Sequence, residues 1–171
     1  PLSINALREE LQVSHRAVSN WVAIFERLYG LFRLPPFGFK MPKAVIKAQK
    51  HYHFDWTLVL NPGARFENMV AVHLLKWTHF KQDTEGQEVN LKYFRSVEGK
   101  EIDFIIEIDN KPSHAIECKL DDAPIATELY HFKKKFPKSE IWQISATGKK
   151  DYMTPEGIRC APAVEFLKNL V

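Results

Sequence analysis

Two neighbouring apolar stretches of the chain carry charged side chains where a buried strand is expected. Glu117 and Lys119 lie two residues apart in SHAIECKLDD (113–122), and Asp103 lies in the preceding stretch, EIDFIIEI. Burying a charge without a partner is costly, so charges inside a strand indicate a purpose. Asp103 and Glu117 are one hairpin apart, and we therefore expect them on adjacent strands with converging side chains.

These residue types suit a site for a hard divalent cation. Carboxylates of Asp103 and Glu117 can hold Mg²⁺ or Mn²⁺, and such an ion lowers the pKa of a bound water and offsets charge on a phosphoryl oxygen. Lys119 can orient or activate that water and stabilise the transition state. Glu67 adds an acid early in a predicted helix, although compensation of the helix dipole explains Glu67 taken alone. The alternative is a buried salt-bridge cluster without chemistry.

The elements that position these residues follow from hydrophobic periodicity. Residues 61–80 predict a helix, residues 91–120 predict three strands joined by turns at VEGK and DNKP, and the rest predicts a helix over 125–136, a strand over 141–147 and a helix over 161–171. Both faces of the second and third strands are largely apolar, which indicates a sheet covered on both sides. In the second strand we expect one face to hold Ile102, Phe104, Ile106 and Ile108, and the other to hold Asp103, Ile105 and Glu107.

The first thirty residues predict a helix, a tight turn and a longer helix. Ser14 can cap the second helix, Gly30 can end it, and its expected inward face consists of Val18, Trp21, Val22, Phe25 and Leu28. Gln12 stands near the turn position where Gly is common. Two short strands after residue 30 would form a wing, so the sequence predicts a winged helix-turn-helix over residues 1–57 and a second domain over 58–171.

The outward N-terminal face of the second helix carries side chains that reach phosphates and base edges: His15, Arg16, Ser19 and Asn20. The following stretch is basic, with Lys40, Lys43, Lys47 and Lys50, and we predict DNA contacts there, chiefly from Lys43 and Lys47. Two alternatives stay open: a helical hairpin that docks on a neighbouring domain, and a strand edge guarded by lysines. His51 and His53 share a strand face, but without a third ligand nearby they favour packing over metal binding.

Composition sets the broad class. The chain has 171 residues, 45% of them hydrophobic, which excludes a disordered chain. A formal net charge of +3 is compatible with nucleic-acid binding but does not by itself indicate it. Two distant cysteines, Cys118 and Cys160, exclude a disulfide scaffold and indicate a reducing compartment. There is no apolar run long enough for a membrane span and no signal peptide, so we expect a cytoplasmic protein with no membrane partner and leave an oligomer open.

At the charged residues the sequence resembles the restriction-endonuclease-like superfamily, whose PD-(D/E)xK signature lies on an αβββαβ core. The matching pieces are EID at 101–103, where Ile102 replaces the signature proline, and ECK at 117–119. The resemblance implies that Asp103, Glu117 and the backbone carbonyl of Cys118 bind metal. It also implies that Lys119 activates water and that Glu67 is an accessory acid.

A wider likeness covers nearly the whole chain. The stretches LSINALREELQVSHRAVSNWVAIFERLYGLFRLPPF, KHYHFDW, GARFENMVAVHLLK and YFRSVEGKEIDFII look like the C-terminal half of a group of prokaryotic AAA-type P-loop ATPases. The chain has no G-x-x-x-x-G-K-[ST] motif, so the ATPase part is absent from it. The likeness implies that an ATPase domain precedes it in a longer protein. The sequence therefore predicts a mixed α/β protein in which a winged helix-turn-helix precedes a restriction-endonuclease-like αβββαβ domain. Its predicted function is DNA binding with Mg²⁺- or Mn²⁺-dependent phosphodiester hydrolysis, and the alternative is an inactive module that targets or regulates the ATPase.

Overall fold

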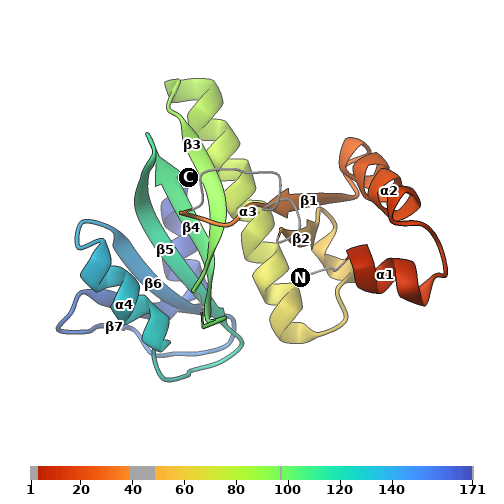
Figure 1. The fold of residues 1–171 in the computed structure, drawn as a ribbon. Helices are drawn as coiled ribbons and strands as arrows, with labels where there is room; N and C mark the ends of the chain where they lie inside the picture. Colours follow the sequence, from red (N-terminus) through yellow and green to blue (C-terminus); the bar gives the residue numbers. More distant parts are fainter. Residues whose placement is uncertain (1–3, 39–48, 97, 171) are drawn as a thin grey trace.

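The computed structural model describes residues 4–38, 49–96 and 98–170 (Figure 1). Lys43 and Lys47, which the sequence predicts to contact DNA, lie outside these residues. Two helices and a hairpin come first: α1 (Ile4–Glu10), α2 (His15–Arg27), β1 (Leu31–Leu34) and β2 (Lys50–His53). A short 3₁₀ turn, η2 (Trp56–Leu58), leads to the long helix α3 (Pro62–Glu85).

A six-stranded mixed sheet forms the centre of the molecule, in the order β3-β4-β5-β6-β8-β7. The strands are β3 (Val89–Arg95), β4 (Glu101–Ile108), β5 (Lys111–Lys119), β6 (Glu140–Ser145), β7 (Tyr152–Met153) and β8 (Ile158–Pro162). β3, β4 and β5 form an antiparallel meander, whereas β5, β6 and β8 run parallel. The turn between β4 and β5 places Asp109 and Asn110 at positive φ, as tight hairpin turns require.

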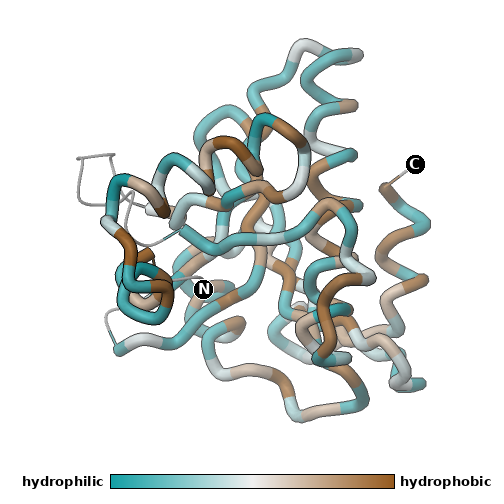
Figure 2. The backbone as a smooth tube through the Cα atoms, turned by 90° about the vertical axis from the view of Figure 1, so that its right-hand side faces the viewer, coloured by the Kyte–Doolittle hydropathy of each residue, from teal (hydrophilic) through white to brown (hydrophobic). Residues whose placement is uncertain are grey.

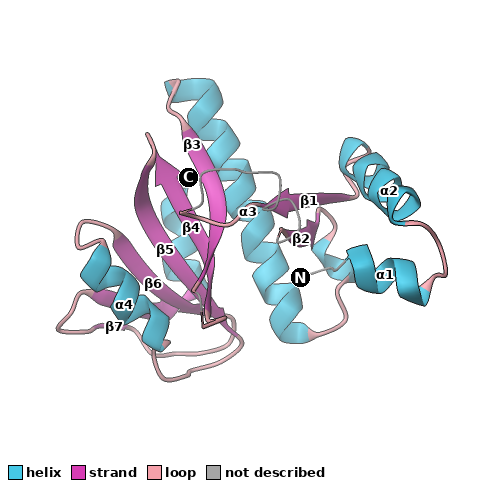
Figure 3. Ribbon diagram, viewed as in Figure 1, coloured by secondary structure: helices cyan, strands magenta, loops and turns pink. Residues whose placement is uncertain are grey.

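Helices cover both faces of this sheet (Figure 3). The hydrophobic core on one face joins α3 and α5 (Ala163–Leu167) to Phe104, Ile106 and Ile116. The core on the other face joins α4 (Thr127–Lys135) to Ile102 and Ile105. The tube coloured by hydropathy alternates between hydrophilic and hydrophobic residues along the helices (Figure 2), which is the pattern of helices with one buried face.

The predicted mixed α/β class is confirmed, and the predicted order of helix, three strands, helix and strand is present. The α3 helix begins as expected, because the Asn61 side chain accepts from the N–H of Ala64 and Pro62 occupies the first turn. It ends five residues later than predicted, at Glu85, and is capped by Gly86, which has a φ of 65°.

The strands β7 and β8 were missed. Arg159 and Pro162 interrupt the apolar pattern of β8, so its residues show no clear alternation. The closing helix was predicted to begin at Ala161, but residues 161–162 end β8 instead and α5 begins at Ala163. A lone parallel strand is recognised by its pairing, here with β6, and that pairing is set by tertiary structure.

The second helix, α2, departs from its predicted packing. Val18 and Val22 are buried against α1 and Leu31, but Trp21, Phe25 and Leu28 are exposed, although the sequence predicts all five as inward. The helix ends through a left-handed Tyr29 rather than through Gly30. Gln12 has a φ of 55°, so the turn before α2 does need the left-handed conformation that Gly commonly supplies.

Most buried side chains of the β1–β2 hairpin belong to the main core, although Leu31 packs with the two helices. Phe32, Leu34 and Tyr52 pack in the cluster that contains the α3 face of the sheet. The N-terminal helices lie to the other side of the hairpin (Figure 1). A predicted boundary near residue 57 would separate this hairpin from the sheet that it packs against, and the division into 1–57 and 58–171 stays a prediction. No helix of the described residues is long and apolar enough to cross a bilayer.

Candidate functional site

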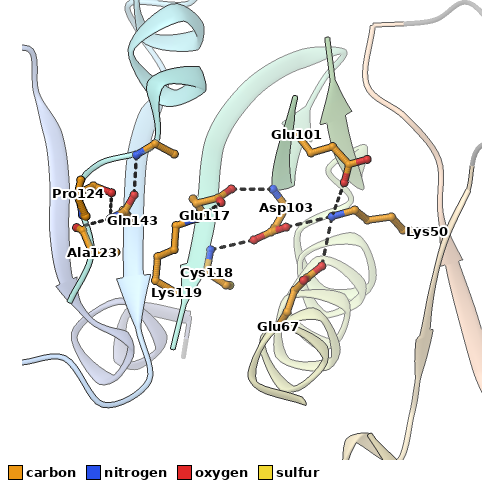
Figure 4. A network of polar contacts seen from close by, with 11 residues as sticks. Lys50, Glu67, Glu101, Asp103, Glu117, Cys118, Lys119, Ala123, Pro124 and Gln143 are labelled. Atoms are coloured by element: carbon orange, nitrogen blue, oxygen red, sulfur yellow. Dashed lines mark hydrogen bonds and ion pairs between the residues drawn. The ribbon is translucent and has the colours of Figure 1, made fainter. Parts of the chain in front are cut away.

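Asp103 and Glu117 lie side by side where β4 and β5 separate. The pairing of the two strands ends at Phe104 and Ile116, so Asp103, just before Phe104, and Glu117, just after Ile116, lie beyond the last pair. The N–H of Asp103 donates to Oε2 of Glu117 at 3.4 Å, and the N–H of Cys118 donates to Oδ2 of Asp103 at 3.0 Å. Each carboxylate therefore replaces a strand-to-strand hydrogen bond and is held by the backbone of the opposite strand (Figure 4).

A β-bulge directs the Asp103 side chain. Lys92 pairs with Ile105 and Phe94 pairs with Ile102, so Asp103 and Phe104 together oppose the single residue Tyr93. The extra residue breaks the alternation of faces. Ile102 consequently packs on the α4 side, and the prediction that it shares a face with Phe104 and Ile106 was wrong. The bulge frees Asp103 from strict alternation, and its carboxylate reaches Lys50 of β2.

Lys50 lies at the centre of a cluster of acids. Its Nζ is 3.0 Å from Oδ1 of Asp103, 3.2 Å from Oε2 of Glu101 and 3.3 Å from Oε1 of Glu67 (Figure 4). Only 7% of Lys50 is exposed. The sequence predicts Lys50 as part of a basic stretch that suits DNA phosphates, whereas in the structure its side chain turns inward to the acids.

The charge balance of the cluster shows in its pKa values. Burial would lower the pKa of Lys50, but Asp103, Glu67 and Glu101 outweigh burial and raise it above the ordinary lysine value. Burial and the Asp103 charge raise the pKa of Glu67, although Lys50 opposes this. The acids are thus incompletely neutralised by Lys50, and an added cation would be favoured there.

Glu67 has a second partner in Tyr52. The hydroxyl of Tyr52 donates to Oε1 of Glu67 at 2.6 Å, and burial followed by the Glu67 charge raises the pKa of that phenol well above its usual range. Two residues apart on β2, Lys50 and Tyr52 both point at the acids. Glu67 is therefore held by specific side chains, which dipole compensation alone does not explain.

Glu117 and Lys119 form a separate pair. Nζ of Lys119 donates to Oε1 of Glu117 at 2.8 Å, and Glu117 is 8% exposed. Burial and the Asp103 charge raise the pKa of Glu117 to about 7. Burial would lower the pKa of Lys119, but its hydrogen bond to Glu117 raises it. Glu117 thus contacts Asp103 through the backbone, while the two lysines pair with different acids.

The donor set fits a hard cation in its chemistry, since it consists of carboxylate oxygens around an existing positive charge. The spacing differs from that of a bound metal. The acids stand 3.0 to 3.3 Å from the Lys50 nitrogen, whereas Mg²⁺ needs oxygens at about 2.1 Å. In the part of the chain that the structure describes, no group of three or more His, Cys, Asp or Glu side chains is arranged to hold a metal ion.

A cleft of about 620 Å³ opens beside the Lys50 cluster. Lys50, Glu67, Glu101 and Asp103 all line it, together with residues of the β1–β2 hairpin and the first half of α3. The acids are therefore reached from the hairpin side of the sheet. Glu117 and Lys119 are not among its lining residues, so their pair stands behind Asp103 as seen from the cleft.

Three residues that sequence reasoning missed hold the site together. Asn68 is 3% exposed and fixes the hairpin to α3, since its amide accepts from the N–H of His53 at 2.9 Å and donates to the His53 carbonyl at 2.6 Å. Gln143, opposite Glu117 on β6, anchors the loop before α4 through Ala126, Ala123 and Pro124. Glu101 completes the acid cluster. One signal was available: Lys50 and Tyr52, like Glu101 and Asp103, have the i, i+2 spacing of a shared strand face.

The predicted DNA-binding residues of α2 lie near its first turn. His15, Arg16 and Asn20 are exposed, and Ser19 is half-buried with its hydroxyl 3.3 Å from Nδ1 of His15. They lie on a different element from the acid cluster. The exposed apolar side chains of Trp21, Phe25 and Leu28 follow on the same helix, and such side chains suit protein contact better than phosphate contact.

Comparison with protein families matches residues 62–166 to the family described as "Domain of unknown function (DUF4143)". The chain belongs to this family. The DUF4143 domain is found at the C-termini of AAA-ATPase-like proteins. The matched residues contain Glu67, Asp103, Glu117 and Lys119, whereas Lys50 and Tyr52 precede them. Neither the comparison with curated proteins nor the comparison with solved structures finds a match.

Proposed function

We propose that this DUF4143 protein binds DNA and hydrolyses phosphodiester bonds with the help of Mg²⁺ or Mn²⁺. The observation that carries the proposal is the mutual clamp between Asp103 and Glu117 at the point where β4 and β5 part. Glu117 in turn holds the ammonium of Lys119. A structural salt bridge does not require two carboxylates that are each held by the opposite strand. A reaction requires its carboxylate oxygens and its lysine to be fixed in position, and this clamp fixes them.

The roles follow from the contacts. Carboxylates of Asp103 and Glu117 would hold the cation, with the backbone carbonyl of Cys118 as a further oxygen. When bound, the ion supplies a more acidic water and offsets charge on the phosphate. Lys119, fixed by Glu117, would orient the attacking water or hold the negative charge that develops on the phosphoryl oxygens. Glu67 would act through a water, since it reaches the site from α3.

The finer fold assignment is part of the same proposal. The succession α3, β3, β4, β5, α4 and β6 has the order of the restriction-endonuclease-like core, with Asp103 on the second strand and Glu117 on the third. The α1 and α2 helices with the β1–β2 hairpin have the order of a winged helix-turn-helix. In this arrangement His15, Arg16, Ser19 and Asn20 would contact DNA, and an ATPase domain would be linked to the module in the same protein.

A second candidate is a module without catalysis that binds DNA or protein and regulates the ATPase. Lys50 favours this candidate, because its ammonium already neutralises part of the acid cluster. The acids, moreover, are spaced for an ammonium rather than for a metal ion. In this case Asp103 and Glu117 would be structural.

Cleavage of supercoiled plasmid separates the two candidates. We expect nicking that requires Mg²⁺ or Mn²⁺, stops with EDTA, and falls at least 100-fold in Asp103→Asn, the usual scale for a lost catalytic group. Glu107→Gln is the matched control: it alters a buried acid of β4 that pairs with Lys92 away from the site. Equal nicking by wild type and Asp103→Asn, or none with either metal, would favour the non-catalytic module.

A further inference from the structure

The Lys50 side chain occupies the position where a cation would enter the site from the cleft. It is the cation nearest to Asp103 among the described residues, with Glu67 and Glu101 completing its surroundings. Its nitrogen also lies 5.6 Å from the ring centre of Tyr93. Because Lys50 is buried and paired with three acids, its position is a specific feature of the site.

Two positive charges do not fit among these acids together. A divalent ion bound by Asp103, with Glu67 nearby, would lie close to the present position of the Lys50 nitrogen and repel it. Its oxygens would also move inward by about 1 Å to reach metal-bonding distance. The lysine stem is flexible, and the cleft of about 620 Å³ gives the ammonium a place to go.

We propose that Lys50 is a built-in competitor for the metal, which holds the acid cluster closed until a divalent cation displaces it. The proposal rests on the metal-dependent function above and adds its regulation. Binding of metal and seating of Lys50 exclude each other. A contact that draws Lys50 away, such as a DNA phosphate in the cleft, would raise metal affinity, and bound metal would strengthen that contact by the same factor.

The position of Lys50 in the chain supports a regulatory role for this residue. The acids belong to the family-matched residues 62–166, whereas Lys50 is supplied by the β1–β2 hairpin that precedes them. Beside Lys50, Asn68 ties β2 to α3 through both backbone groups of His53. The hairpin thus keeps Lys50 registered over the acids, and a change in how the hairpin docks would change access to the site.

The test is calorimetric titration of the whole chain with Mn²⁺ at neutral pH, which reads binding rather than activity. We expect Lys50→Gln to bind Mn²⁺ about 5- to 150-fold more tightly than wild type, the usual range for coupled sites. Lys92→Gln is the matched control, because Lys92 is a partly buried strand lysine paired with the single acid Glu107, and it should bind like wild type.

A second variant covers the case in which Lys50→Gln does not fold without metal. Lys50→Arg keeps the charge, and the guanidinium can hold carboxylates with two hydrogen bonds, so it should bind Mn²⁺ as weakly as wild type or more weakly. A melting scan of the same variants adds an independent measure: Mn²⁺ should raise the Tm of Lys50→Gln more than that of wild type.

The outcomes separate this proposal from the one on which it rests. Equal Mn²⁺ affinity for wild type, Lys50→Gln and Lys50→Arg would overturn the competition and leave the metal-dependent function standing. Absence of Mn²⁺ binding in every variant, at millimolar concentration, would overturn both and make Lys50 a permanent counter-ion of a structural cluster. Tighter binding by Lys50→Gln with weak binding by Lys50→Arg supports the competition.

Discussion

The ammonium of Lys50 lies 3.0 Å from Oδ1 of Asp103, across 53 residues of sequence. This contact joins the N-terminal hairpin to the strand that carries the candidate chemistry. It also decides what Asp103 faces: a lysine on the cleft side and the Cys118 N–H on the strand side.

Glu117 gives the metal-free protein a specific dependence of stability on pH. Its pKa in the folded state is about 7, above the ordinary glutamate value, because of burial and the Asp103 charge. The folded state therefore holds this proton more tightly than the unfolded state does. The resulting stabilisation is complete below about pH 4.5 and is lost as the pH rises through about 7.

Urea unfolding with EDTA at pH 5 and pH 8 measures this effect. Wild type should lose more stability between the two values than Glu117→Gln, which cannot release the proton. Glu107→Gln serves as the control and should keep the wild-type difference. A Glu117→Gln variant with the same pH response as wild type would contradict the assignment.

Tyr52→Phe should destabilise the protein by about 1 to 3 kcal/mol, the scale of a buried hydrogen bond to a charged group. The phenylalanine keeps the packing of the ring against Phe32 and Phe104, so the loss reports the 2.6 Å bond to Glu67. Urea unfolding measures it. Tyr29→Phe, at an exposed ring, is the control and should change little. A loss no larger than that of the control would mean that Glu67 does not depend on Tyr52.

Lys119→Ala should separate metal binding from cleavage. It leaves the carboxylates in place and removes only the partner of Glu117, so Mn²⁺ should still bind in a calorimetric titration. The nicking rate should nevertheless fall about 100-fold or more. Glu67→Gln should cost less, because an acid on α3 acts through a water. Equal nicking by wild type and Lys119→Ala would reveal a contaminating nuclease.

The double variant Arg16→Ala with Asn20→Ala should weaken binding to duplex DNA, measured by fluorescence anisotropy at several salt concentrations. Each lost phosphate contact should lower the slope of log affinity against log salt by about 0.9. Lys134→Ala, an exposed lysine on α4, is the control. Binding that ignores both the double variant and salt would make α2 a protein-docking helix, in keeping with the exposed Trp21, Phe25 and Leu28.

Asn68→Ala should loosen the hairpin. Two buried hydrogen bonds to His53 are lost and the His53 backbone is left unpaired, so we expect a loss of about 2 to 4 kcal/mol. Hydrogen exchange should then show reduced protection of β1 and β2 rather than of β4 and β5. Asn90→Ala, at a half-buried asparagine of β3, is the control. Uniform loss of protection across the sheet would contradict a local role.

The sequence by itself determined the local elements and the charged strand positions. The helix over most of α3, the turn at Asp109 and Asn110, and the placement of Asp103 and Glu117 on adjacent strands are all encoded in short windows, where periodicity and turn chemistry act directly. The i, i+2 spacing of Glu117 and Lys119 likewise placed both side chains on the same face of one strand.

Only the tertiary structure decided what these charges meet. The bulge opposite Tyr93 turns Asp103, and it arises from a one-residue mismatch between β3 and β4 that neither strand shows alone. The Lys50 side chain points inward because the hairpin packs into the core of the sheet. The sequence of a basic stretch does not indicate whether its lysines face acids or solvent. β8 is defined by its pairing with β6, because a short strand has no period of its own long enough to detect.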